Sequence, residues 1–580
     1  MILQTTGGFN PEVFDGTLFP LGPWCLPTYG PHVATAMGLS KDGDLDIGTT
    51  TDRILQLLER QLYPALNDFH GVDLHHDVWH HSLGTYLRVL TPLVVLRYNL
   101  IQRVINVLGY NEFTFINVDE KWLTPKNRSA LQICLNSHAW NHALFAELCT
   151  SLGMSPRPPS IQRDFDYTGL IASSSRRPNS TQAMKRTLMS ACNSIVRRTN
   201  SIVTQTMLPN RIEFGLAFRL KTLPFYWFPE ESNDIPRSND THHQLLSKVH
   251  SEDHDEGILL RTIARRLPHS YVEDFHSLRQ IASMRLPTHP RRVFTSNLHQ
   301  SSDGFLLWLS EKRHAGTHVA IAQHGGVHSL CRDVPADVSS EIALANSYFA
   351  WGDQGSPSAK LIAGPTLVNV GVKRLKRKVD ANKGPLLVVL DVSYRYPSIP
   401  RGMNGSRFEY AQMINELILG LDRVAVPEIL LRPYRGAELY DDSIIDLLTP
   451  DPRISVDYSF PPIEERFAQA QMVVTTSLGT TFFQTTHHGI PSIMLLNPIL
   501  SPISAWAEEG LMPLRKAAVF FDNPKQASTH INRTMSASNS WWSDLEVKRA
   551  IELFHDHMSP SCNSPIRYFA AKLRQFEGSF

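Results

Sequence analysis

Short apolar runs alternate with helix-length runs along the second half of the chain, and this alternation restricts the fold more than any other feature. Strands are predicted at 292–296 and 318–323, around a helix at 303–312. After a basic connector at 372–383 the pattern starts again. It predicts further strands at 386–393, 428–434, 453–457, 472–477 and 492–497, and helices at 408–421, 463–470 and 477–489. Such alternation is typical of βαβ units, so we expect two parallel sheets.

The part of the chain before these sheets has a different pattern. Apolar residues recur at helical spacing from about 50 to 160, which predicts a helical insertion. Polar stretches at 173–200 and 231–256 are expected to be mobile surface loops. We therefore predict an α/β protein with two facing Rossmann-like domains and a helical N-terminal elaboration. Residues 1–370 would form the N-terminal domain, 371–384 the linker, and 385–580 the C-terminal domain with its C-terminal helices.

The composition argues against nucleic acid as a partner. Charged residues make up 19% of the 580 residues, and the formal net charge is +1. Such a balance creates no overall field for nucleic acid or an anionic membrane, so an anionic ligand must be recognised by a local site.

We find neither a signal peptide nor an apolar run of about 18 residues, which predicts a cytoplasmic protein. The most apolar stretch, Leu83 to Leu108, is interrupted by arginines and is expected to be an amphipathic helix pair.

The cysteines and histidines do not predict a metal site. The six cysteines are scattered without a CxxC spacing, which favours reduced thiols. Several of the 25 histidines are adjacent, as at His80-His81 and His487-His488. Neighbours on a helix point about 100° apart, so these pairs are poor chelators. We expect no bound metal and no cofactor.

The strongest local signal is the segment MVVTTSLGTTFFQTTHHGIP. A strand at 472–476 stops at Ser477, where a helix begins with the sequence Ser477-Leu478-Gly479-Thr480-Thr481. Ligands of open α/β sheets bind beyond the carboxyl ends of the strands, and a helix N-terminus there offers N–H groups to phosphate. Gly479 permits close backbone approach, while Ser477, Thr480 and Thr481 add hydroxyl groups. Serine and threonine are also ordinary N-cap residues, but the strand–turn–helix context favours phosphate binding.

Further candidates follow other strands. His324, with Gly325 and Gly326, ends the strand at 318–323, where the imidazole could act as a base or stabilise a diphosphate; a capping histidine in a tight turn is the alternative. Glu341 could deprotonate an acceptor hydroxyl or hold a ribose, or could be an ordinary surface carboxylate. Three arginines beyond parallel strands are phosphate candidates: Arg395, Arg432 and Arg435. Nearer the N-terminus, Trp24 and Trp79 are interpreted as core residues.

Several motifs in order resemble one family of transferases encoded in bacterial surface-polysaccharide and O-antigen gene clusters. The resemblance is carried by FPLGPWC, LNDFHGV with the Trp79 helix, the block into IAQHGG, the segment from Glu341 to Trp351-Gly352, SLGTTFFQTTHHGIPSIMLLNP and SWWSDLEVKRAIELF. It extends nearly from end to end. It implies a GT-B-like glycosyltransferase, and it marks His324, Glu341, Ser477, Thr480 and Thr481 as ligand-site candidates.

The chain departs from the family pattern at four places. His80 stands where the family usually has arginine, and Gly84-Thr85-Tyr86 stands where it has Gly-Pro-Trp. Val327-His328 replaces an aromatic–glycine pair. Gln484 replaces a glutamate that holds a ribose in many GT-B enzymes, so Gln484 would bind a hydroxyl without charge.

The resulting hypothesis is a metal-independent GT-B glycosyltransferase that moves a sugar from a nucleotide-activated donor to a surface-glycan acceptor. The QHG turn is similar to that of transferases of CMP-activated acidic sugars, which suggests a CMP-linked donor. The acceptor would be a glycan or a lipid-linked glycan, with peripheral association with a membrane. Two alternatives stay open: a nucleotide-sugar epimerase on the same fold, and a non-catalytic glycan- or nucleotide-binding member of an assembly complex.

Overall fold

A computed structural model of the chain provides the structure. It describes these residues: 2–7, 14, 17–26, 47–119, 122–160, 193–227, 244–245, 247–332, 336–353, 360–377, 383–391, 395–396, 407–434, 444–498 and 500–575. Most of the loop expected at 173–200, and the first half of the one expected at 231–256, lie outside these residues.

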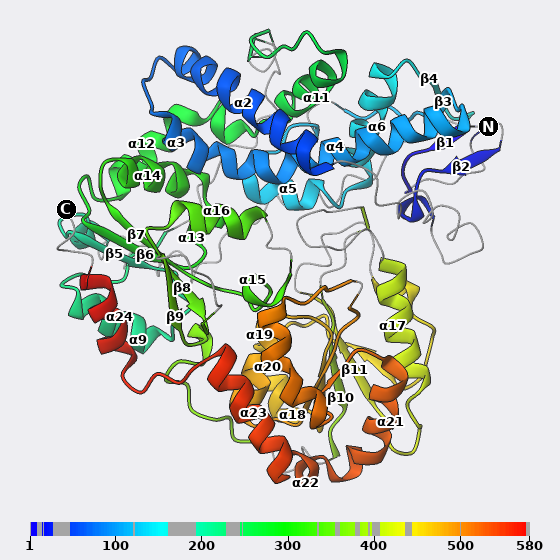
Figure 1. Cartoon of the computed structure of the whole chain (residues 1–580), viewed down its shortest axis with the longest axis vertical. Coiled ribbons are helices and arrows are strands. Elements are labelled where there is room, and N and C mark those ends of the chain that lie inside the picture. Colours follow the sequence, from blue (N-terminus) through cyan, green and yellow to red (C-terminus); the bar gives the residue numbers. More distant parts are fainter. Residues whose placement is uncertain are drawn as a thin grey trace.

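The described residues form three parallel sheets, one more than the sequence predicts (Figure 1). The additional sheet lies at the N-terminus and has the order β2-β1-β3-β4. Its strands are β1 (Ile2–Gln4), β2 (Leu18–Pro20), β3 (Glu112–Thr114) and β4 (Ser155–Arg157). Each has three residues, which is too short for a recognisable two-residue periodicity. The motif FPLGPWC begins within the second strand of the chain, and its LGPWC part follows that strand.

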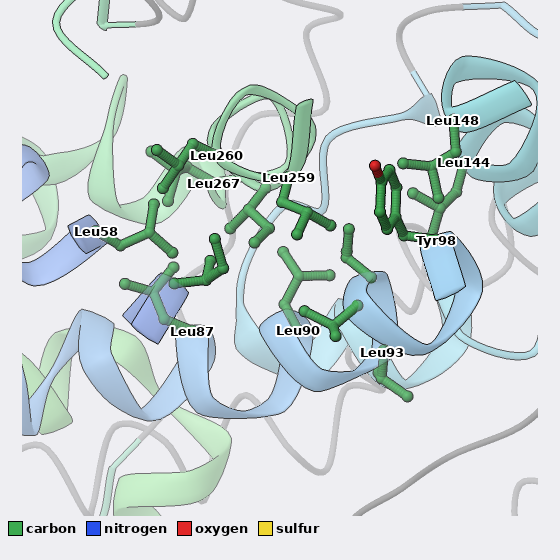
Figure 2. Close-up of a cluster of buried hydrophobic side chains, with 14 of the residues drawn as sticks. Leu58, Leu87, Leu90, Leu93, Tyr98, Leu144, Leu148, Leu259, Leu260 and Leu267 are labelled. Atoms are coloured by element: carbon green, nitrogen blue, oxygen red, sulfur yellow. The ribbon is translucent and has the colours of Figure 1, made fainter. Parts of the chain in front are cut away.

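A layer of helices packs beside this first sheet. It contains α2 (Ile47–His70), α3 (His76–His81), α4 (Leu83–Leu108), α5 (Arg128–Cys134), α6 (His138–Ser151), α11 (His254–Ala264) and α12 (Phe275–Arg285). Leucines from α2, α4, α6 and α11 meet in a shared apolar core, where Tyr98 also lies (Figure 2). Trp24 and Trp79 are buried in the same core, as expected. The Trp79 indole donates to Asn67 Oδ1 over 2.9 Å.

The stretch from Leu83 to Leu108 forms one continuous helix, so the predicted helix pair is wrong. Pro92 lies inside it, yet the residues on both sides are buried. Packing thus outweighs the hydrogen bond that the proline removes. Arg97, which looked like an interruption, is fully buried and donates to Asn141 Oδ1 over 2.6 Å and to the Leu93 carbonyl. A charged residue in a helical run is therefore compatible with a buried helix when it finds such partners.

The second sheet runs in chain order, β5-β6-β7-β8-β9. Its strands are β5 (Ser201–Thr204), β6 (Arg292–Thr295), β7 (His318–Ala322), β8 (Ser347–Trp351) and β9 (Leu361–Gly364). Alternate residues of β5, β6 and β7 enter two different apolar clusters, so helices cover both faces of the sheet. The connecting helices include α13 (Leu298–Ser301), α14 (Asp303–His314), α15 (Val327–Leu330) and α16 (Ala336–Leu344).

The third sheet has the order β12-β11-β10-β13-β14-β15. Its strands are β10 (Leu386–Val389), β11 (Ile429–Arg432), β12 (Ile454–Val456), β13 (Met472–Thr475), β14 (Ser492–Leu495) and β15 (Phe520–Phe521). Its helices are α17 (Arg407–Leu419), α18 (Ile463–Gln469), α19 (Thr480–His488), α20 (Ala505–Lys516), α21 (Pro524–Thr534), α22 (Ser538–Trp542) and α23 (Leu545–Met558). The chain proceeds outward from β10 in one direction and from β13 in the other. The topological switch point therefore lies between β10 and β13.

The last helix returns to the second sheet. Helix α24 (Pro565–Gln575) packs its buried Phe569, Ala570 and Leu573 against the same face as α9 (Asn210–Arg219). This differs from the expectation that all the C-terminal helices lie with the third sheet. The α/β class and the two Rossmann-like sheets predicted from the sequence are confirmed.

Two further observations concern the helices and the cysteines. None of the helices among the described residues is both long and apolar enough to span a bilayer. Five cysteines within the described ranges form no disulfide bond: Cys25, Cys134, Cys149, Cys331 and Cys562.

Candidate functional site

The start of helix α19 lies at the switch point of the third sheet. Ser477 follows β13, and Gly479 occupies the N-cap position in an extended conformation without a side-chain capping bond. Ser477, Thr480 and Thr481 are half-buried. Because Gly479 has no side chain that could cap this end, the first N–H groups of α19 present a partial positive charge beyond the carboxyl edge of the sheet. The position predicted for phosphate binding has the expected local geometry.

The turn after β7 packs directly against this helix start. A methyl group built on Gly326 would lie 2.3 Å from the Leu478 carbonyl oxygen and 3.2 Å from that of Gly479. Only a residue without a side chain permits so close a contact between two backbones. The two segments that the sequence marks independently, at 323–326 and 477–481, are therefore adjacent.

Gln323 connects this turn to β8. Its side-chain amide donates to the Gly325 carbonyl over 2.8 Å, and its Oε1 accepts from the Trp351 backbone N–H over 2.8 Å. The Trp351 indole donates back to the Gln323 carbonyl over 3.1 Å. The same indole packs edge-on against Phe483 of α19, with ring centroids 5.1 Å apart. Gln323 and Trp351 thus fix the position of the turn relative to α19.

Glu341 lies beneath the turn and is almost completely buried, with 1% of its side chain exposed. Its Oε1 lies 3.2 Å from His299 Nε2 and accepts a hydrogen bond from Gln300. Its Oε2 lies 4.0 Å from His324 Nδ1, within ion-pair range but too far for a hydrogen bond. The alternative of a surface carboxylate is wrong for Glu341. His299 and Gln300, on the short helix α13, were not recognised from the sequence because no motif surrounds them.

His324 is the more accessible member of this pair, with 16% of its side chain exposed. Its Nδ1 faces Glu341, so its Nε2, on the other side of the ring, is the atom that can face a bound ligand. The arrangement of a buried carboxylate behind a partly exposed imidazole is suited to general base chemistry.

His328 adds a third group at this position. Its ring centroid lies 4.4 Å from that of His324, and its Nδ1 lies 3.2 Å from the Tyr348 hydroxyl. Ligand atoms of His324, His328 and Glu341 all lie within 4.8 Å of one another, so this set could hold a divalent cation. His75, Asp77 and His314 form a second such group, which is exposed. The expectation of no metal stays a prediction.

Of the three arginine candidates, Arg395 and Arg432 lie within the described residues, and each contacts a different part of the fold. Arg432 pairs with Asp457 at 2.7 Å and donates to the Pro461 carbonyl over 2.7 Å. Arg395 donates to the carbonyls of Trp24 and Leu26 over 2.7 and 3.2 Å. These contacts give both guanidinium groups partners within the fold. The phosphate role predicted for them stays a prediction. Arg435 lies outside the described residues. Gln484 is half-buried on α19, one turn after the helix start.

Two sizeable hollows lie elsewhere. Cavities of about 420 and 450 Å³ share Glu311 and Lys312, near the end of α14. Strand β7 begins soon after, at His318, so these cavities are at the amino edge of the second sheet. A smaller hollow lined by Asp391, Tyr410, Thr476 and Asn497 lies at the carboxyl edge of the third sheet. Of these, only the last is beside the switch point where ligands of such sheets bind.

A model of the LIC12162 family transferases matches residues 11–573. The chain belongs to this family. No curated protein matches it significantly.

Solved structures show only a distant likeness. A glycosyltransferase from Rickettsia africae ESF-5 is 9% identical to this chain, with a TM-score of 0.34. The alignment covers 66% of this chain and 100% of that protein. A protein from Listeria monocytogenes assigned as a UDP-N-acetylglucosamine 2-epimerase is 10% identical, with coverages of 66% and 98% and a TM-score of 0.33. TarM is 9% identical to this chain, with a TM-score of 0.33. The alignment covers 49% of this chain and 54% of TarM, so this chain spans about half of the length of TarM.

We expect Gly326→Ala to disturb this family member more than Gly325→Ala. The added methyl group of Gly326→Ala would meet backbone oxygen, which cannot move aside, and overpacking of this kind costs about 1–3 kcal/mol. At Gly325 the nearest atoms belong to the His328 ring at 3.6 Å, an ordinary contact. Denaturant unfolding of both variants tests the comparison. Equal stabilities would mean that the close backbone contact does not exist in solution.

Asp457→Asn should test the structural role of Arg432. Hydrogen bonds from Arg466, with further charge from Arg432, hold the pKa of Asp457 well below its usual range. We expect the variant to lose about 2–3 kcal/mol of unfolding free energy at neutral pH. Because the native pKa is depressed, the parent's advantage should persist down to about pH 4, the pKa of an unfolded aspartate, and shrink below it.

The exposed Asp556 provides the control, since Asp556→Asn should change stability by about 0.5 kcal/mol or less. If Asp457→Asn left stability unchanged but altered nucleotide affinity, Arg432 would belong to the binding site.

Proposed function

We propose that this chain is a GT-B glycosyltransferase that transfers a sugar from a nucleotide-activated donor. The observation that carries the proposal is the direct contact between the His324 turn and the uncapped start of α19 at the switch point. A donor with its phosphates at α19 would place its sugar beside His324. Membership of a transferase family supports this assignment.

The roles divide between the two sides of this contact. The N–H groups of α19, with Ser477, Thr480 and Thr481, would stabilise the diphosphate or phosphate charge that develops as the glycosidic bond breaks. His324 would remove the proton from the acceptor hydroxyl. Glu341 is too buried to touch substrate, so it would orient His324 and stabilise its protonated form, as a positioning residue.

The donor and acceptor follow from the resemblance. A CMP-linked acidic sugar is the donor we propose, because the QHG turn is similar to that of transferases using such donors. The acceptor would be a glycan or lipid-linked glycan of the cell surface. No metal is needed in this scheme, since a helix N-terminus supplies the positive potential.

Nucleotide binding is tested by a thermal-shift screen with CMP, UDP, GDP and dTDP. A ligand that binds only the folded protein must raise Tm, and we expect the largest rise with CMP. Thr480→Glu should weaken nucleotide affinity tenfold or more, because a carboxylate in the first turn repels phosphate. Thr480→Gln has the size of the glutamate variant without its charge, so it should weaken nucleotide affinity much less than Thr480→Glu does. No shift with any of the four nucleotides would contradict the proposal.

Catalysis is tested by replacing His324 and Glu341 one at a time. His324→Ala should lower kcat by about 10²–10⁴-fold while nucleotide binding persists, as expected for a lost general base. Glu341→Gln should have a smaller effect on kcat.

Activity should survive chelation with EDTA. If EDTA abolished activity and Zn²⁺ or Mn²⁺ restored it, the cluster of His324, His328 and Glu341 would instead hold a metal. Turnover of donor without any acceptor would favour an epimerase.

A further inference from the structure

The outer surface formed by α9 and α24 carries aromatic and basic side chains together. We propose that this surface, defined by Phe214, Phe218, Ile195 and the basic residues around them, docks onto an anionic membrane. It covers one face of the second sheet, and the two helices are labelled side by side at the edge of the molecule in Figure 1.

The two helices form one continuous platform. A methyl group built on Gly215 would lie 2.5 Å from Ile566 Cδ1, which places α9 and α24 in close contact. The Arg574 guanidinium donates to the Arg219 carbonyl at the end of α9. The sides of both helices that face the sheet are buried, because Ile212, Leu216, Phe569 and Leu573 pack against it in one apolar cluster.

The outward side of α9 exposes large apolar groups where a soluble helix usually has polar ones. Phe214 is 48% exposed and Phe218 is 81% exposed, and their spacing of four residues places them on the same side of the helix. Ile195, 55% exposed, belongs to the turn before β5. That turn adjoins the end of α9, because the hydroxyls of Thr199 and Thr222 lie 2.9 Å apart.

The charge around these groups is strongly one-sided. Residues 193–227 contain five Lys or Arg residues and a single acidic residue, while 559–575 contain three and none. The exposed members are Arg197, Arg198, Arg211, Arg219, Lys221, Arg567 and Arg574. The acidic residue, Glu213, is turned to Thr206, whose N–H and hydroxyl donate to it over 3.2 and 2.5 Å. The surface therefore presents almost only positive charge to a partner.

The basic segment of the linker extends this surface. The Arg211 side chain donates to the Gly371 carbonyl, and the exposed Lys373 and Arg374 follow directly. The whole chain has a net charge of only +1, so this local concentration is not a consequence of a basic protein.

An anionic bilayer matches both properties. Aromatic side chains insert at the boundary between headgroups and acyl chains, and lysine and arginine near the surface are attracted by anionic lipids. The charge favours this partner over a second copy of the chain, because two such surfaces would repel each other. A membrane contact at this position is independent of the proposed glycosyl transfer.

Vesicle sedimentation tests the inference with the full chain. We expect it to bind phosphatidylcholine vesicles containing phosphatidylglycerol, to bind pure phosphatidylcholine much more weakly, and to be released by high salt. Phe214→Glu/Phe218→Glu should lower the fraction bound on the order of tenfold. A matched control is Leu419→Glu/Val424→Glu, at apolar positions exposed by 68% and 90% at and just beyond the end of α17, on the other side of the molecule (Figure 1). The control should bind as the parent does.

Equal binding by the parent and the Phe214/Phe218 variant would overturn the proposal, as would failure of the parent to bind anionic vesicles. If the variant changed only the sedimentation coefficient of the free protein, the surface would be a protein interface instead. Nucleotide affinity, measured in parallel, should be the same in parent, variant and control, which separates this inference from the proposed reaction.

Discussion

The candidate site depends on one contact between two backbones, that of Gly326 with the carbonyl of Leu478. It joins the carboxyl edge of the second sheet to the start of α19 in the third. Each sheet alone offers half of a site: a histidine in one case and a set of N–H groups in the other. Because a carbonyl oxygen cannot rotate away as a side chain does, the distance between the halves is fixed by the glycine.

Buried polar groups keep this contact in one arrangement. Gln323 has no exposed surface, and its side chain hydrogen-bonds both the Gly325 carbonyl in its own turn and the backbone N–H of Trp351. Glu341 is held by His299 and Gln300 on a different helix from its own. A buried group of this kind is costly to leave without its partners, so small displacements of the His324 turn are opposed.

The first sheet and its helices are attached to the third sheet through the segment that follows β10. Arg395 donates to backbone carbonyls near Trp24, and the Tyr396 hydroxyl lies 2.7 Å from His138 Nδ1. Tyr396 also belongs to the apolar core of the helical layer. The strand end that leads to the switch point is thus anchored to the N-terminal part of the chain.

The alternation of apolar runs was sufficient to predict β6 and β7 of the second sheet and β10 to β14 of the third, because such periodicity is a local property of the sequence. Strands β5, β8, β9 and β15 were not predicted. The helix that follows β13 and the turn at His324 were also predictable, since glycine and serine at the end of a strand signal a turn or a helix start. The first sheet was not, because strands of three residues carry no period. The single helix from Leu83 to Leu108 was missed because the partner of Arg97, Asn141, is 44 residues away.

By itself, the sequence determined the α/β class, the order of most elements and the two segments most suited to chemistry. Only the tertiary structure decided which candidates work together. It placed His324 beside α19, buried Glu341 behind it, and bound Arg395 and Arg432 to other parts of the fold. The reason is physical: a guanidinium or carboxylate takes its role from the partners within a few ångströms, and in this chain those partners come from distant parts of the sequence.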